Sequence, residues 1–191
     1  MTQAEGHITA LNLPMLDPLP EATRSYFALC NEKLGFVPNL LKAYAFDVEK
    51  LNAFTAMYND LMLGNSGLSK LEREMIAVVV SSINHCWYCL VAHGAAVREL
   101  SGDPVLGERM AFNYRSADLE PRQRAMLDFA AKLTSASATI EEADRQALRD
   151  VGFSDADIWD VAGVTAFFNM TNRVASAVAM EPNDAYHGAH R

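Results

Sequence analysis

Cys86, Cys89 and His93 are the residues of this chain whose types and spacing could do chemistry. Two thiols stand three positions apart, and an imidazole follows the second thiol by four positions. Residues three and four positions apart share one face of an α-helix, so a helix here would align the three side chains with Cys89 in the middle. A thiol with a partner thiol and a base within reach has the composition of a thiol-redox site.

Glu74 is a candidate partner for the imidazole. It precedes the apolar run 75–80, in a helix whose start is marked by a capping box of Ser69 and Glu72. Consecutive helices joined by a tight turn tend to pack antiparallel, which would bring Glu74 level with His93. A carboxylate beside an imidazole can fix its tautomer and relay a proton. The pattern alone leaves a second interpretation open, in which Glu74 is a solvated residue of an early helical turn.

The elements that must position these residues are predicted to be helices. Asn84 is expected to be the N-cap of a helix over residues 85–100, which would stabilise a thiolate in its first turn. Strand signals are nearly absent, so we predict an all-α, compact multi-helix fold. We expect a helical N-terminal extension over residues 1–66 packed on a core of residues 67–182, and a polar C-terminal tail, residues 183–191, that is loose or docked on a neighbour.

Composition narrows the function classes. The chain has 16 basic and 24 acidic residues, a net charge of −8, which argues against nucleic acid and anionic membrane surfaces as partners. Neither a signal-like start nor a membrane-spanning apolar stretch is seen, so a cytoplasmic protein is expected. Three cysteines are too few for a disulfide scaffold, and Cys30, alone in an apolar run, is interpreted as core. Trp159 is also expected in the core, and Thr139 with Glu142 as another capping box.

The spacing of Glu74, Cys86, Cys89 and His93 resembles the motif of alkylhydroperoxidase D-like proteins, in the carboxymuconolactone decarboxylase superfamily. Residues 68–74 and 82–84, and the late segment 168–173, are similar to its peroxidase-related branch.

The resemblance implies a role for each motif residue. Cys89 would be the peroxidatic cysteine and Cys86 the resolving one, with Glu74 and His93 as the proton relay that activates Cys89. The best-described members have a second histidine where this chain has Tyr88. A phenol is a poor general base at neutral pH, so the rate and the peroxide preference are expected to differ.

The expected reaction is reduction of a hydroperoxide by a dithiol that closes to a disulfide, with an external dithiol as reductant and no cofactor or metal. The family resemblance also implies a homo-oligomer, a trimer or hexamer, with the hexamer favoured.

Three alternatives remain open. His85, Cys86, Cys89 and His93 could bind a metal, although structural zinc sites usually draw their ligands from two separate segments. The chain could be a decarboxylase-type member of the same superfamily, against which the paired thiols weigh. It could also be a non-enzymatic thiol redox sensor, which would react once and stop.

Overall fold

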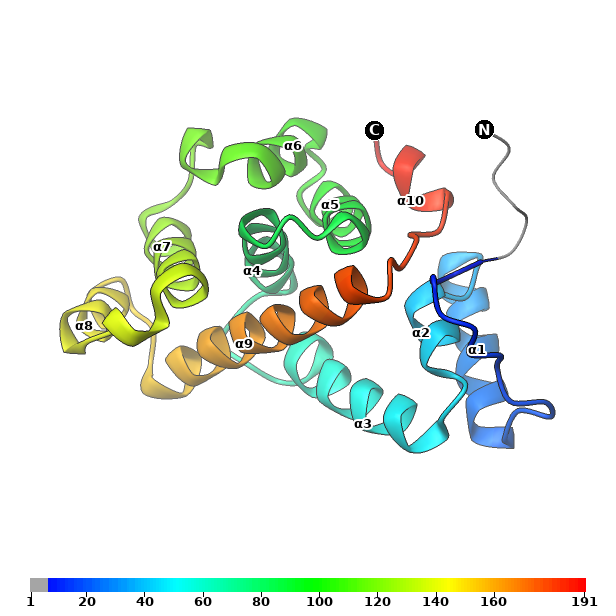
Figure 1. Ribbon diagram of the computed structural model, residues 1–191. Coiled ribbons are helices and arrows are strands. Elements are labelled where there is room, and N and C mark those ends of the chain that lie inside the picture. The colour runs from blue at the N-terminus through cyan, green and yellow to red at the C-terminus, as the bar shows by residue number, and fades with distance from the viewer. Residues whose placement is uncertain (1–6) are drawn as a thin grey trace.

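A computed structural model describes residues 7–191 and confirms the all-α fold, with no strand in that range. Figure 1 shows the helices gathered around α4 and crossed by the long helix α9. The α-helices are α1 Glu21–Leu34, α2 Asn39–Tyr44, α3 Val48–Tyr58, α4 Lys70–Ile83, α5 Trp87–Ser101, α6 Pro104–Asn113, α7 Pro121–Ala136, α8 Glu142–Asp150, α9 Asp155–Ala177 and α10 Ala185–Gly188. A π-helical turn, η1 Asn59–Leu63, and two 3₁₀ turns, η2 Tyr114–Ser116 and η3 Ser137–Thr139, complete the set.

Helix α4 is the centre of the molecule. Residues 72–81 are all buried, and the helix packs against α5, α6, α7 and α9. Its apolar run has no polar face to turn toward water, so it must be surrounded by other helices. The polar side chains among residues 72–81 therefore lie inside the protein, against the neighbouring helices.

The segment before residue 66 shares one hydrophobic core with the rest of the chain. Leu51 and Phe54 of α3 join the same buried cluster as Phe167 of α9, and the Phe54 and Phe167 rings lie 5.4 Å apart between centroids. Figure 1 shows α1 and α2 beside the end of α9. The division of the chain at residue 66 stays a prediction.

Helix caps were predicted with mixed success. The capping box of Ser69 and Glu72 is confirmed. Asn84 as an N-cap was wrong: it ends α4, and Cys86 occupies the N-cap position of α5. The capping box at Thr139 was also wrong, because the chain forms η3 there. The box of α8 is made by Glu141, its N-cap, and Asp144, the third residue of the helix.

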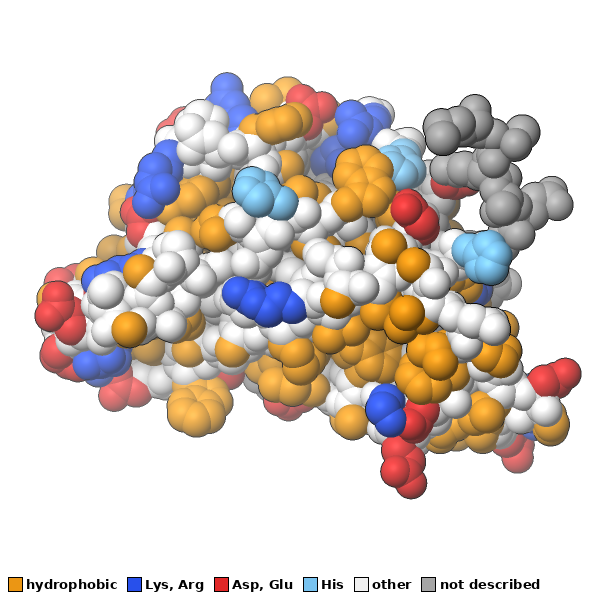
Figure 2. All heavy atoms as spheres, viewed as in Figure 1, with side chains coloured by type: hydrophobic (Ala, Val, Ile, Leu, Met, Phe, Trp, Pro, Cys, Tyr) orange, Lys and Arg blue, Asp and Glu red, His pale blue; other side chains and the backbone are white. Residues whose placement is uncertain are grey.

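Trp159 was expected in the core but is 77% exposed, because it lies on the outer face of α9. Cys30 is partly buried and packs against the main core. In Figure 2, hydrophobic side chains gather on the surface around α3 and its junction with α9. Within residues 7–191, none of the helices is both long enough and apolar enough to cross a membrane.

Candidate active site

Glu74 and His93 form a hydrogen-bonded pair between two neighbouring helices. His93 Nδ1 of α5 lies 2.6 Å from Glu74 Oε2 of α4, and both side chains are about seven-eighths buried. The Phe168 ring of α9 meets the imidazole edge-on, with the centroids 4.6 Å apart. The interpretation of Glu74 as a solvated residue was therefore wrong, because antiparallel packing of α4 and α5 places its carboxylate against the imidazole.

Cys86 and Cys89 are free thiols at the start of α5, and each residue is 1% exposed. Cys86 is the N-cap residue and Cys89 lies in the first turn, where the amide groups of a helix are without intrahelical partners. The N-terminal end of a helix also carries partial positive charge, which stabilises a thiolate. The pair is thus buried at a helix start that favours one negative charge.

The two thiols share their charge unequally. Hydrogen bonding with Cys89 lowers the pKa of Cys86 to about 6, in spite of burial, and the Ser176 hydroxyl and the nearby His93 act in the same direction. Interaction with Cys86 and burial together raise the pKa of Cys89 above its ordinary value. The pair is therefore expected to hold one negative charge, which these interactions place mainly on Cys86.

An amide network holds the turn that precedes the cysteines. Asn84 Nδ2 donates to the Oδ1 atoms of Asn169 and Asn172 in α9, at 3.0 Å each. Asn172 Nδ2 in turn donates to Ser81 Oγ of α4 at 2.9 Å. Asn172 and Ser81 also contribute hydrogen bonds that lower the pKa of Cys89. His85 then turns outward with φ of 53°, which lets the chain reverse from α4 into α5.

Tyr88 is buried between the cysteines and the N-terminal segment. Its hydroxyl accepts a hydrogen bond from the Leu40 amide at 3.1 Å, and burial raises the pKa of the phenol well above its ordinary value. A phenol that keeps its proton cannot act as a base toward the thiols. The hydrogen bond of Tyr88 with Leu40 joins α5 to α2.

Comparison with known proteins identifies the family of this chain. The carboxymuconolactone decarboxylase family matches residues 49–104, a range that contains all four motif residues. The chain is 73% identical to an uncharacterized peroxidase-related protein from Silicibacter sp. TM1040, with all of both chains covered and a TM-score of 0.96. It is 45% identical to another from Ralstonia eutropha JMP134, described as an alkylhydroperoxidase AhpD core, with 97% and 98% of the two chains covered and a TM-score of 0.93.

The chain is an AhpD-like member of the carboxymuconolactone decarboxylase superfamily. The debrominase Bmp8, solved with 2,3,4-tribromopyrrole, shares 18% identity over 94% of this chain and 92% of its own, with a TM-score of 0.77, which shows a common fold alone. No curated protein matches the chain.

The thiol pair of this AhpD-like chain is covered by segments from both ends of the sequence. Ala175 and Met180 pack with Cys86 and Cys89, and Leu40 and Tyr186 close the cluster from outside. The C-terminal tail is therefore docked on its own chain: Arg98 of α5 donates to the carbonyl oxygens of Tyr186 and Ala189 at 3.0 and 2.9 Å.

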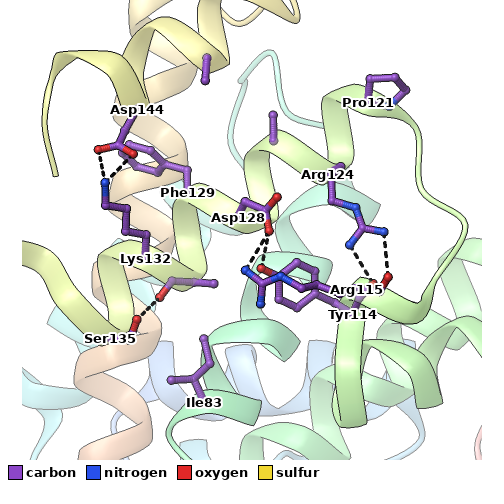
Figure 3. A pocket seen from close by; sticks show the side chains of 13 residues that line it. Ile83, Tyr114, Arg115, Pro121, Arg124, Asp128, Phe129, Lys132, Ser135 and Asp144 are labelled. Atoms are coloured by element: carbon purple, nitrogen blue, oxygen red, sulfur yellow. Dashed lines mark hydrogen bonds and ion pairs between the residues drawn. The ribbon is translucent and has the colours of Figure 1, made fainter. Parts of the chain in front are cut away.

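A small polar pocket opens beside the cysteines. Its volume is about 330 Å³, and it is lined by Asn84, Asn172, Arg173 and Ser176. A larger pocket of about 860 Å³ lies between η2, α7 and α8 (Figure 3), but neither cysteine lines it. Its charged groups pair with one another, for example Lys132 with Asp144 at 2.7 Å. Neither cysteine lines the small pocket, but Asn84, which does, lies two residues before Cys86.

Sequence reasoning missed the contribution of α9 to the site. Its polar residues Asn169, Asn172, Arg173 and Ser176 recur at helical spacing on one face of an otherwise apolar helix, a signal that was available in the sequence. Among the described residues, no group of three or more His, Cys, Asp or Glu side chains is arranged to hold a metal ion. His85, a proposed metal ligand, is exposed while both cysteines are buried.

Proposed function

We propose that this protein is a thiol-dependent peroxidase that reduces hydroperoxides through a Cys86–Cys89 dithiol/disulfide cycle. The observation that carries the proposal is the 2.6 Å hydrogen bond between Glu74 and His93, placed one helical turn from Cys89. A buried carboxylate–imidazole pair beside two thiols at a helix start supplies a nucleophile, a resolving thiol and a proton carrier. The AhpD-like relatives support the same chemistry.

The cycle begins with activation of a thiol. His93, oriented by Glu74, takes the proton of Cys89, and the Cys89 sulfur attacks the outer oxygen of the hydroperoxide. The S–O bond forms as the O–O bond breaks, and the departing alkoxide receives the proton from His93 and leaves as the alcohol. Cys89 is now a sulfenic acid.

The second step closes the disulfide. Cys86 attacks the Cys89 sulfur, and the hydroxyl group leaves as water after taking up a proton. Two thiols and one hydroperoxide thus give one disulfide, one alcohol and one water. An external dithiol then reduces the disulfide and restores both thiols. No cofactor enters this balance.

The test is single turnover of the reduced protein with one equivalent of cumene hydroperoxide. We expect stopped-flow consumption of the peroxide, and a Cys86–Cys89 disulfide in the peptide map. Glu74→Gln should slow the reaction by about 100-fold or more, because general acid–base catalysis contributes about 100- to 10,000-fold. Cys30→Ser is the matched control and should react like the unaltered protein.

The outcomes separate the proposal from its rivals. Peroxide loss without a Cys86–Cys89 disulfide would contradict the cycle. Repeated turnover with a dithiol reductant is expected of an enzyme, whereas one reaction followed by a stable disulfide would identify a redox sensor. Metal in the protein as purified, released on titration of the thiols, would favour the metal-binding alternative.

A further inference from the structure

The small pocket beside the cysteines is built by a polar face of α9. Asn169, Asn172, Arg173 and Ser176 follow one another at intervals of three, one and three residues, so they share one side of the helix. That side faces the start of α5, because Asn169 and Asn172 both bind Asn84 at 3.0 Å. A polar stripe on a largely apolar helix is thus directed at the turn that carries the thiols.

The pocket lies next to the thiol pair. Asn84, which lines it, precedes Cys86 by two residues, and Ser176, which also lines it, follows Ala175, which packs with both cysteines. Both cysteines are covered, by Ala175 and Met180 among others. A small molecule in the pocket would therefore approach the thiol pair past Ser176 and Asn172.

Arg173 gives the pocket its charge. It is the charged member of a lining whose other members are two amides and a hydroxyl. Arg173 is an exposed residue, and its Nη1 atom donates to Asn169 O at 2.6 Å and Asn169 Oδ1 at 2.8 Å, which orients the guanidinium along α9. Within residues 7–191, no carboxylate forms an ion pair with it, and its Nε and Nη2 donors have no hydrogen-bond partner there.

Two free donors on this guanidinium match the two oxygens of a carboxylate. Arg173 is the one charged residue among the four that line the pocket, so an anionic group is the ligand that the pocket favours. The volume of about 330 Å³ lies at the small end of the range of ligand pockets, so a small substrate matches it best.

We propose that the pocket selects small hydroperoxides that carry a carboxylate, and that Arg173 binds this carboxylate while the peroxide group reaches the thiols. The inference rests on the proposed peroxidase function and adds a substrate class to it. Arg173 is a specificity residue, because it would touch the substrate away from the O–O bond that breaks.

The experiment compares two substrates that differ only in the carboxylate: cumene hydroperoxide and its para-carboxylate. In the unaltered protein we expect a higher kcat/KM for the carboxylate. Arg173→Gln should reduce that preference by about tenfold or more, mainly through KM, because a charge-assisted hydrogen-bonded pair is lost. Arg173→Lys should restore part of it. Arg109→Gln, which removes an exposed arginine of α6, is the matched control and should leave the preference unchanged.

A binding measurement keeps this inference distinct from the peroxidase proposal. The para-carboxylated alcohol product is titrated calorimetrically into the reduced protein and into Arg173→Gln. Binding that depends on Arg173 supports the carboxylate site even if no peroxide is consumed. Absence of binding, equal kcat/KM for the two peroxides in the unaltered protein, or an equal loss with both in Arg173→Gln overturns it. A changed oligomeric mass of Arg173→Gln, with the preference intact, would assign Arg173 to a subunit boundary and also overturn it.

Discussion

At the scale of single residues, the cysteine pair behaves as one titrating unit. Each thiol is the largest cause of the shift in the other's pKa: Cys89 lowers that of Cys86, and Cys86 raises that of Cys89. The charge of the resting pair is therefore expected on Cys86, while the family resemblance assigns the attack on peroxide to Cys89. These statements are compatible, because the resting site of a charge does not fix which sulfur reacts.

The thiol titration of the reduced protein should show this coupling. Thiolate absorbance is expected to appear with a midpoint of about pH 6, below the ordinary range, because the Cys86 thiolate is stabilised in the folded state. This stabilisation is fully present above the ordinary thiol pKa and disappears as the pH falls through about 6. In Cys89→Ala the midpoint should rise, because the largest cause of the lowering is removed.

Peroxide reactivity of the single variants completes the same test. Cys86→Ala should still consume one equivalent of peroxide and leave a trappable sulfenic acid on Cys89, since the thiol that raises the pKa of Cys89 is gone. Cys89→Ala should react slowly. Cys30→Ser serves as the control for a cysteine outside the pair. The reverse order of reactivity would assign the attack to Cys86.

At the scale of elements, the site depends on how α4 is held. Glu74 lies in the second turn of α4, just after the capping box in which Ser69 Oγ accepts from the Glu72 amide at 3.1 Å and Glu72 Oε2 accepts from the Ser69 amide at 2.7 Å. Glu72 also binds Arg122 of α7, with 3.1 Å between Nε and Oε1. The start of α4 is thus held by its own capping box and by a contact with α7, and this positions the Glu74 carboxylate against His93.

Ser69→Ala should destabilise the protein by about 1 kcal/mol, because an N-cap hydroxyl that satisfies a backbone amide is lost. The expected result is a lower Tm and a lower denaturant midpoint with an unchanged m-value. Ser137→Ala, which removes an exposed hydroxyl of η3, is the comparison and should have little effect. Equal Tm values for the two variants would show that the capping box does not stabilise α4.

At the scale of the whole molecule, both ends of the chain converge on the thiols. Asn183 of the tail accepts from the Asn39 amide at 2.7 Å, and Tyr186 packs edge-on against Phe36 with 5.0 Å between ring centroids. Figure 1 shows α10 close to α5, on the side of the molecule where α2 begins. The reactive pair is therefore enclosed by contacts between segments that are about 145 residues apart. The expected homo-oligomer stays a prediction.

Tyr186→Ala should open this enclosure. We expect Cys86 to be alkylated several-fold faster at fixed pH, with helix content retained, because the ring that covers the cluster is removed while α4 and α5 keep their packing. The measurement is the rate of iodoacetamide labelling followed by mass spectrometry. Phe112→Ala removes a ring that is already 87% exposed and should leave the rate unchanged. An unaltered rate in Tyr186→Ala would mean that the thiols are reached by another route, such as the pocket at Arg173.

The sequence by itself determined most of the helices and the candidate site residues. Local signals suffice for these: proline, glycine and capping boxes mark helix ends, and the spacing of Cys86, Cys89 and His93 needs only helical periodicity. The sequence also offered the pairing of Glu74 with His93, because two helices joined by a short turn tend to pack side by side, but it left a solvated Glu74 open until the structure showed the contact.

Only the tertiary structure decided what surrounds that set. Asn84 does not cap α5. Its side-chain amide donates hydrogen bonds to two residues of α9, about 85 positions further along the chain. The cover supplied by Tyr186 and the pocket beside Arg173 likewise depend on distant segments meeting. Local patterns carry no information about which buried donors and acceptors will find one another, because that is settled by packing.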